Sequence, residues 1–441
     1  MNKSKFPFLF LKKTKIRLDK LYRKFSIHYP IDCLIVAEKF SETAFEAVAS
    51  LLRGKTESTP SVQTSSSGSG PAEKTMLLIR HDAIGDYILF RNFIEVLKGS
   101  SKYKDYKITL LGNAAWKELS EFLDAKFIGE FIWLDKEKFN SNFLYRYKKI
   151  KEITCKSYDA VIHPFSRDYF NIDNDIVLFL NAVEKIGSIR KLKKLKGLKW
   201  FSNEFVYKKL YTETIPDRKG SDFEFYKNKY FFETLLSEKI DIEKPQIILP
   251  EEKRVGFSKS PYAIIFIGAS VKHRKWPVEN FAQIALYLQE KYGMAIVLCG
   301  GKKELEDAAV FKKYLPPNFN YFDLTAKVNL IELLYAVKNS ALVISNETMM
   351  PHIAMAASDT TQILVISSGE NCYGFFTPYP KSISKGRYHI IYHPAIESNL
   401  ETFIKNAALM EYDCGYDIKL NLSEITVESV KNKIDEVLKP N

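Results

Sequence analysis

The chain has 441 residues, about three times the ~150 residues of a typical single domain, so we expect two domains and an appendage. Hydrophobic residues make up 46% and charged residues 27%, as in soluble globular proteins, which excludes wholesale disorder and a multi-span membrane protein. Lys and Arg number 65 against 53 Asp and Glu, a net charge of +12 that suits phosphates, nucleic acid or acidic lipid as partners.

Five cysteines are scattered along the chain, with no CxxC pair and no cluster with histidine. This pattern argues against a disulfide scaffold and a zinc module, so we expect a reducing, cytoplasmic compartment. The longest early apolar run, residues 6–11, is too short for the core of a signal peptide or for a spanning helix.

Residues 1–54 are predicted to be a basic amphipathic extension. Lysines and arginines follow the early apolar run, and apolar residues recur at helical spacing over 18–25. Such a helix can make a peripheral membrane contact through residues 6–25, with its lysines at acidic headgroups, or it can pack on the protein's own surface. Residues 55–73 lose the apolar periodicity and are rich in Ser, Thr, Gly and Pro, which predicts a flexible linker.

Beyond the linker, short apolar runs alternate with helical patterns. Strands are predicted at 75–79, 107–111, 159–163, 263–267, 295–298, 341–344 and 362–366, and helices at 87–97, 116–123, 277–292, 330–337 and 352–357. This alternation predicts an α/β fold with parallel, doubly wound sheets. We expect an N-terminal domain at 74–250 and a C-terminal domain at 251–441, facing a central cleft, with a last helix at 426–438 that packs on either one.

The segment LLIRHDAIGDY brings Gly85 and Asp86 to a strand-to-helix turn. An aspartate there can cap the helix or serve as a catalytic base, and the sequence leaves both open. A single glycine is not the GxGxxG fingerprint, so a Rossmann dehydrogenase is poorly supported.

The segment GASVKHRKWP, residues 268–277, follows a strand of the second half. Small residues, four basic side chains and Pro277 as the first residue of the next helix predict a phosphate site rather than a solvated basic loop. After the next strand comes Gly300, with Glu304 four residues on, a carboxylate that can accept from ribose hydroxyls or cap a helix. Farther on, SNETMMPH ends in His352, which by itself is more typical of a buried structural histidine.

These features in this order resemble glycosyltransferase family 9, the heptosyltransferases that extend the lipopolysaccharide inner core, over about residues 75–438. The resemblance implies a GT-B fold of two Rossmann-like domains, with the donor on the C-terminal half and the acceptor on the N-terminal half. It gives Asp86 the role of general base, and Lys275 that of a catalytic cation on the departing diphosphate. Arg167, in the segment that resembles the family's central strand, is implied to contact the acceptor. The implied donor-binding residues are Gly268, Ser270, Lys275, Gly300, Glu304, Glu347, Thr348, Met349 and His352.

Two residues depart from the family's Asp-Thr-Gly-Pro-Met-His pattern. Glu347 replaces its aspartate, and Met349 stands where its glycine lets the backbone approach the donor pyrophosphate. Methionine adds bulk and discourages positive φ, so we expect the phosphate to be held differently or less tightly.

The resemblance implies an inverting, metal-independent glycosyltransferase without a cofactor. It would move a heptose or related sugar from a nucleotide-diphosphate donor, such as ADP-heptose, to a hydroxyl of a lipopolysaccharide-type or other surface glycan, in the cytoplasm or at the cytoplasmic face of the inner membrane. Three alternatives stay open: a metal at the DxD of residues 173–175, a non-catalytic nucleotide-sugar or glycan-binding protein, and nucleic-acid binding by residues 190–196. The last run has few aromatic residues for base stacking and better suits an anionic acceptor or a membrane, so no specific nucleic acid is expected.

Overall fold

A computed structural model of the chain describes residues 73–164, 172–189, 210–218, 223–250, 261–369, 375–409 and 420–439. The predicted extension, nearly all of the predicted linker, Arg167 and the basic run 190–196 lie outside the described residues. Within the described part, no helix has the length and apolar character that a membrane span requires.

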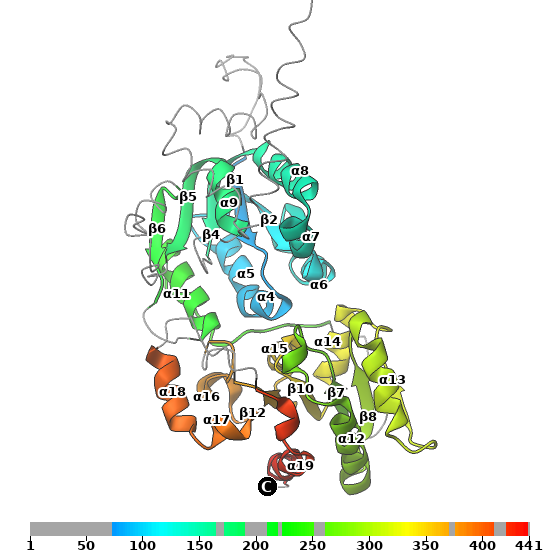
Figure 1. Ribbon diagram of the computed structural model, residues 1–441. Helices are drawn as coiled ribbons and strands as arrows, with labels where there is room; N and C mark the ends of the chain where they lie inside the picture. Colours follow the sequence, from blue (N-terminus) through cyan, green and yellow to red (C-terminus); the bar gives the residue numbers. More distant parts are fainter. Residues whose placement is uncertain are drawn as a thin grey trace, which may run out of the picture. The chain divides into compact units, whose positions relative to one another are not determined.

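The first sheet has six strands in the order β3-β2-β1-β4-β5-β6 (Figure 1). The pairings of β1 with β4, β4 with β5 and β5 with β6 are parallel, and Leu77 lies opposite Val161. The strands are β1 (Thr75–Arg80), β2 (Lys107–Asn113), β3 (Glu130–Leu134), β4 (Ser157–His163), β5 (Asn181–Ile189) and β6 (Glu213–Pro216).

The second sheet also has six strands, in the order β12-β11-β10-β7-β8-β9, with parallel pairings throughout. The strands are β7 (Tyr262–Phe266), β8 (Ala295–Cys299), β9 (Tyr321–Asp323), β10 (Leu342–Asn346), β11 (Gln362–Ser367) and β12 (Tyr388–Tyr392). Counted from its own first strand, each sheet has the doubly wound order 3-2-1-4-5-6, which confirms the predicted fold class. The order reverses between β1 and β4 and between β7 and β10, and such sheets bind ligands at the carboxyl ends of these strands.

In the second sheet β7 is apolar along its whole length and β10 is apolar up to Ile344, because helices cover both faces. Every residue of β7 and β10 is buried. Ile265, Leu298 and Ile344 form one core cluster with Phe281 and Ile434 from the helices. Burial on both sides explains why these strands read as continuous apolar runs rather than as alternating patterns.

The helices in the first half of the chain are α4 (Ile84–Phe90), α5 (Asn92–Gly99), α6 (Lys117–Leu123), α7 (Lys136–Ser141), α8 (Phe143–Thr154), α9 (Ile172–Phe179) and α11 (Glu224–Leu236). Those in the second half are α12 (Val278–Tyr292), α13 (Leu305–Lys313), α14 (Leu330–Lys338), α15 (Met349–Ala357), α16 (Lys381–Ser384), α17 (Pro394–Glu397), α18 (Leu400–Leu409) and α19 (Val427–Val437). Short 3₁₀ turns precede α6, α12 and α13 at Ala114–Trp116, Lys272–Arg274 and Lys302–Glu304.

Two helix predictions need correction. The helix predicted at 87–97 is two helices that meet at Arg91, because Ile94 N donates to Arg91 O, a tighter turn than an α-helix makes. Pro277 is not the first residue of its helix: its ψ of 132° is extended, and its carbonyl accepts from Asn280 N, so it caps α12 from outside.

The C-terminal helix, which the sequence left unassigned, packs on the second sheet. α19 contacts α12 and β12. Trp276 Nε1 donates to Ile425 O at 2.8 Å, and Tyr292 OH from α12 donates to Asp435 Oδ1 of α19 at 2.6 Å. The chain's last helix therefore belongs to the C-terminal half.

By contacts the chain divides into two compact units. The first unit consists of the residues up to Ile79, Thr109–Leu111 and Leu134–Pro216. The second unit consists of Arg80–Ile108, Gly112–Trp133 and the residues from Asp217 onward. The boundary near residue 250 stays a prediction. Helices α4, α5, α6 and α11 fall in the same unit as the second sheet, and so do all the residues of the site described below.

Candidate functional site

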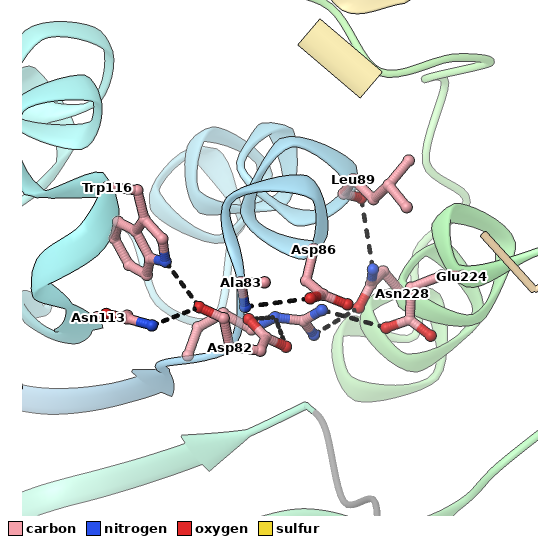
Figure 2. A network of polar contacts seen from close by, with 9 residues as sticks. Asp82, Ala83, Asp86, Leu89, Asn113, Trp116, Glu224 and Asn228 are labelled. Atoms are coloured by element: carbon pink, nitrogen blue, oxygen red, sulfur yellow. Dashed lines mark hydrogen bonds and ion pairs between the residues drawn. The ribbon is translucent and has the colours of Figure 1, made fainter. Parts of the chain in front are cut away.

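The turn after β1 is held by hydrogen bonds to one carbonyl. Asp82 O accepts from Asn113 Nδ2 and from Trp116 Nε1, each at 3.0 Å (Figure 2). All three residues are buried, and the Trp116 ring stacks on Tyr87 of α4 with centroids 4.4 Å apart. The turn that carries Gly85 and Asp86 is therefore held against the segment that joins β2 to α6.

Asp86 is buried near the start of α4, with 7% of its surface exposed. Its Oδ2 accepts from Ala83 N at 3.1 Å (Figure 2), which is the capping contact that the sequence allowed. The charge of Asp86 also acts on Arg80 and on His352, so the carboxylate lies close to both. Capping and catalysis are compatible here, because a carboxylate has about four lone-pair positions and this bond uses one.

Arg80, at the end of β1, is a fully buried cation that ties the turn to α11. Its guanidinium donates to Asp82 Oδ1, Asn228 Oδ1 and Glu224 Oε1, each at 3.1 Å. Burial lowers the pKa of Arg80, but the charges of Asp82 and Glu224 outweigh it and raise the pKa overall. Glu224 and Asn228 lie beside the turn in Figure 2, and the sequence did not reveal them because they are about 145 residues away along the chain.

Helices α4 and α15 meet where a glycine faces a histidine ring. A Cβ at Gly85 would lie 3.2 Å from His352 Nε2 and 2.7 Å from its Cδ2, and the second distance is shorter than real Cβ atoms show. His352 lies on the same face of α15 as Met349, three residues earlier. Glycine at 85 therefore lets α15 approach the residue that precedes Asp86.

His352 is held in this contact by Tyr379, whose hydroxyl lies 2.9 Å from His352 Nδ1. The Tyr379 ring packs on Phe223, with centroids 4.6 Å apart. Burial lowers the pKa of His352 to about 4, and the nearby charge of Asp86 only partly opposes this. The imidazole is therefore neutral at physiological pH, as a buried and hydrogen-bonded histidine should be; its predicted role in donor binding stays a prediction.

The loop after β7 is clamped by Asn346, at the end of β10. Asn346 Nδ2 donates to Ile267 O at 3.1 Å and to Gly268 O at 3.3 Å, and its Oδ1 accepts from Trp276 N at 2.9 Å. Asn346 is fully buried, whereas Ser270, in the middle of the loop, is exposed. The sequence included Asn346 in a polar turn but gave no sign that its amide would hold the neighbouring loop.

Lys275, predicted to contact phosphate, lies between two carboxylates. Its Nζ is 3.0 Å from Glu304 Oε1 and 2.7 Å from Asp307 Oδ2. Glu304 Oε2 accepts from Gly301 N at 3.0 Å, so Glu304 also makes the capping contact that the sequence allowed. Asp307 is a further charged residue of this site that the motifs did not indicate.

The start of α15 carries the other predicted donor residues. Glu347 is buried and accepts from the Ser367 hydroxyl, and Thr348 precedes α15 in an extended conformation without capping it by its side chain. Met349 is the first residue of α15 and, among the described residues, is not one of those with positive φ. The predicted conflict between methionine and a positive φ at this position therefore does not arise, although its bulk remains.

A cavity of about 820 Å³ lies at the carboxyl ends of β7 and β8. The residues that line it are Ala114, Ala115, Lys117, Glu118, Glu121, Phe122, Phe266, Cys299, Gly300, Gly301, Lys302, Ala326, Val328, Asn329, Leu330, Ile331, Leu333 and Met349. Two predicted donor residues, Gly300 and Met349, are among them, whereas Asp86 and His352 are not. Ala326 has φ 56°, and its N–H donates to Gly300 O at 2.9 Å, so a strained residue fixes the glycine turn.

The described residues include no group of three His, Cys, Asp or Glu side chains that could hold a metal ion. Asp173, Asn174 and Asp175 lie in α9, but their side chains are not among those described. Independence from metal stays a prediction.

The model of one protein family, described as glycosyltransferase family 9 (heptosyltransferase), matches residues 225–381, about a third of the chain. This match confirms the resemblance to that family over the segment that carries Lys275, Glu304, Met349 and His352; Asp86 lies outside it. No curated protein matches the chain.

Solved structures of two-domain glycosyltransferases share the fold. A glycosyl transferase family 9 protein from Veillonella parvula matches with a TM-score of 0.59 at 20% identity, over 83% of this chain and 97% of that one. The E. coli heptosyltransferase WaaC with ADP matches at 0.54 and 14% identity, over 82% and 99%. The E. coli ADP-heptose lipopolysaccharide heptosyltransferase II matches at 0.52 and 16%, over 82% and 98%. At these identities the likeness establishes the fold, which is GT-B-like.

The Gly85→Ala substitution should destabilise the protein by roughly 1–3 kcal/mol, because the new methyl group would force the His352 ring and α4 apart. Urea unfolding measures the effect. In the matched Gly99→Ala variant, the new methyl group meets nothing within 4 Å, so its stability should be unchanged or slightly raised. Equal losses in the two variants would contradict the contact.

Acid should destabilise the protein through His352. Below pH 6.5 the unfolded chain takes up a proton at this residue, whereas the folded chain does so only near its folded pKa of about 4. The free energy of unfolding should therefore fall by roughly 3 kcal/mol as the pH drops through this window, and this group should add no pH dependence above it. Urea titrations at several pH values should show a shallower slope for His352→Gln than for wild type; parallel slopes would refute this.

Replacing Asn346 by leucine should cost at least about 3 kcal/mol, because Trp276 N and the carbonyls of Ile267 and Gly268 lose a buried partner. Thermal and urea unfolding would measure the loss. The exposed Asn320→Leu change serves as control and should stay within about 0.5 kcal/mol of wild type.

Proposed function

We propose that the protein is an inverting glycosyltransferase, which moves a sugar from a nucleotide-diphosphate donor to an acceptor hydroxyl. The observation that carries this proposal is the contact between Gly85 and His352. It brings the carboxylate of Asp86 close to α15, whose first residue, Met349, lines a cavity of about 820 Å³. A buried carboxylate therefore lies near a cavity that is large enough for a nucleotide.

The residues that line the cavity support the proposal that its ligand is a nucleoside diphosphate. Apolar side chains such as Phe266 and Leu330 offer surface for a base, and the Gly300–Gly301 turn lets a ligand approach the backbone. Glu304 caps that turn, and carboxylates so positioned accept from ribose hydroxyls. The E. coli relative WaaC was solved with ADP.

The diphosphate would lie at the start of α15. The first N–H groups of a helix are unpaired and carry its positive dipole, and the Thr348 side chain does not cap them. Met349 keeps its N–H in this position. Gly268 and Ser270, on the loop clamped by Asn346, would approach the same anion.

In the proposed reaction Asp86 takes the proton from the acceptor hydroxyl as its oxygen bonds to the anomeric carbon. The bond from that carbon to the diphosphate oxygen breaks, and the nucleoside diphosphate leaves with the electron pair. Attack from the face opposite the leaving group inverts the anomeric configuration. The bond from Ala83 N and the contact of α4 with His352 fix the direction of the Asp86 carboxylate.

We further propose a heptose or related sugar as the transferred group and a lipopolysaccharide-type or other surface glycan as the acceptor. The description of the family model and the fold of the two E. coli heptosyltransferases support this choice. The acceptor contact of Arg167 and the membrane contact of residues 6–25, at the cytoplasmic face of the inner membrane, are part of the same proposal. The second candidate function is donor binding without transfer. It is favoured by the ion pairs that Lys275 makes with two carboxylates.

The test begins with the protein and a panel of ADP-, UDP- and GDP-sugars, first by thermal shift and then by release of nucleoside diphosphate with glycan and lipopolysaccharide-core acceptors. Release with one donor and acceptor pair supports transfer. Binding without release from any pair supports the second candidate, and no binding at all overturns both. Assays with and without chelator examine the predicted independence from metal.

Once an active pair of donor and acceptor is known, Asp86→Asn should lower turnover by about 10²–10⁴-fold, because the proton transfer is lost. The dissociation constant of the donor should stay within about threefold of the wild-type value. Product release and calorimetry give the two quantities. Asp105→Asn, an exposed aspartate in the same half, should keep full turnover. Unchanged turnover in Asp86→Asn would exclude it as the base.

A further inference from the structure

Glu224, the first residue of α11, is a carboxylate with only 2% of its surface exposed. Its Oε1 accepts from Arg80 Nη2 at 3.1 Å, and its backbone N donates to Phe375 O at 2.8 Å. Phe375 is also buried, and Lys227 Nζ lies 4.5 Å from the centre of its ring. The Glu224 carboxylate is therefore held in position through its own backbone as well as through its ion pair.

Asn228, one turn farther along α11, binds the same guanidinium. Its Oδ1 accepts from Arg80 Nη1 at 3.1 Å, and its Nδ2 donates to Leu89 O of α4 at 3.4 Å. Residues four apart lie on one face of a helix, so Glu224 and Asn228 together hold two nitrogens of Arg80. The Arg80 side chain is fully buried, and its charge therefore stays at the turn that carries Asp86, beside which both α11 residues lie in Figure 2.

The charges of Arg80 and Asp86 interact. Burial lowers the pKa of Arg80, but the charges of Asp82, Glu224 and Asp86 raise it overall. An interaction between two charges is mutual, so Arg80 favours the ionised form of Asp86, whereas the like charge of Glu224 opposes it. Buried charges are little screened by salt, and a general base must be ionised to accept a proton. The availability of Asp86 as a base therefore depends on how α11 holds Arg80 and Glu224.

Other titratable groups on the turn and on the elements packed against α4 keep their own surroundings when a neutral residue replaces an acidic one on α11. His352 of α15 is neutral, because burial lowers its pKa to about 4. Asp82 stays paired with Arg80 at 3.0 Å, and Lys227 with Asp217 at 3.5 Å. The further groups are the buried His81 and the cluster of Tyr87, Arg91 and Asp124, in which Asp124 accepts from the other two.

We propose that Glu224 and Asn228 are positioning residues: by holding Arg80 at the turn after β1, they set the pH range over which Asp86 can accept the proton of the acceptor hydroxyl. The inference rests on the proposed transfer reaction. Neither residue lines the cavity, and both belong to a helix far from Asp86 in the sequence. They act on the reaction through Arg80 and not by touching a substrate.

Two substitutions of similar size on α11 change the charge beside Arg80 in opposite directions. Glu224→Gln removes a negative charge and keeps an oxygen that accepts from Nη2, whereas Asn228→Asp adds a negative charge at Nη1. For an active pair of donor and acceptor, kcat/KM is measured as a function of pH. Its acid limb should move to lower pH in Glu224→Gln and to higher pH in Asn228→Asp, by about 0.5 to 1 pH unit in each case.

A merely structural role predicts a different result: kcat falls at every pH, and the acid limb stays where it is in wild type. That outcome would overturn the inference. The donor dissociation constant should stay within about twofold in both variants, because neither residue lines the cavity. Unfolding midpoints show whether each variant is folded, and Glu224→Gln alone decides the question if Asn228→Asp does not fold.

The matched control is Glu233→Gln, which removes the same charge from the same helix about 13 Å farther along. Its acid limb should coincide with that of wild type, since at this distance solvent and salt screen the charge. A shift as large as that of Glu224→Gln would show that the contact with Arg80 is not the cause, and would refute the inference.

Two more variants assign the acid limb to its group. If Asp86 gives the limb, Asp86→Asn should lose it together with most of its turnover, and His352→Gln should keep it at the wild-type pH. A limb that disappears in His352→Gln instead overturns the inference and leaves the transfer reaction standing. If no pair of donor and acceptor releases nucleoside diphosphate, the proposed function falls and the inference falls with it.

Discussion

The close approach of the His352 ring to the backbone of Gly85 is the contact on which the site depends. It joins α4, which carries Asp86, to α15, whose first residue lines the cavity. The His352 ring is held in place because it is buried in its neutral form and its Nδ1 contacts the Tyr379 hydroxyl. Glycine at position 85 allows the two helices to come close at a point where a side chain would meet the His352 ring.

The two sheets secure their ligand-facing loops by similar means. In both halves the loop after the first strand is held by a buried asparagine at the end of a neighbouring strand: Asn113 bonds to Asp82 O, and Asn346 bonds to Ile267 O and Gly268 O. A tryptophan takes part each time, Trp116 through its ring nitrogen and Trp276 through its backbone. A loop that runs past the end of a sheet lacks ladder partners, so side-chain amides supply the bonds that keep it in one conformation.

The sequence predicted the regular elements well where burial dictates a pattern. β7 and the first three residues of β10 are continuous apolar runs because both faces are covered, and α12 alternates with a helical period over fifteen residues. It did not predict β5, whose pattern is mixed, or the pairing of Arg80 with Glu224 and Asn228, which joins segments far apart in the chain. It could not choose between a cap and another role for Asp86 and Glu304, because both side chains do make the cap, and a capping bond does not by itself exclude a second role for a carboxylate. Asp307 was not singled out, because it is one of two acidic residues in the first turn of α13 and acidic residues are ordinary there.

Ala326 illustrates how the shape of the cavity is obtained. Its φ of 56° belongs to a region that glycine occupies freely and that costs alanine about 1 kcal/mol or more. Glycine there would relieve the backbone, but it would also remove a methyl group from the wall and leave the adjoining turn looser. If the cavity holds the base of the proposed donor, glycine at this position should make the protein more resistant to heat and less selective among nucleobases.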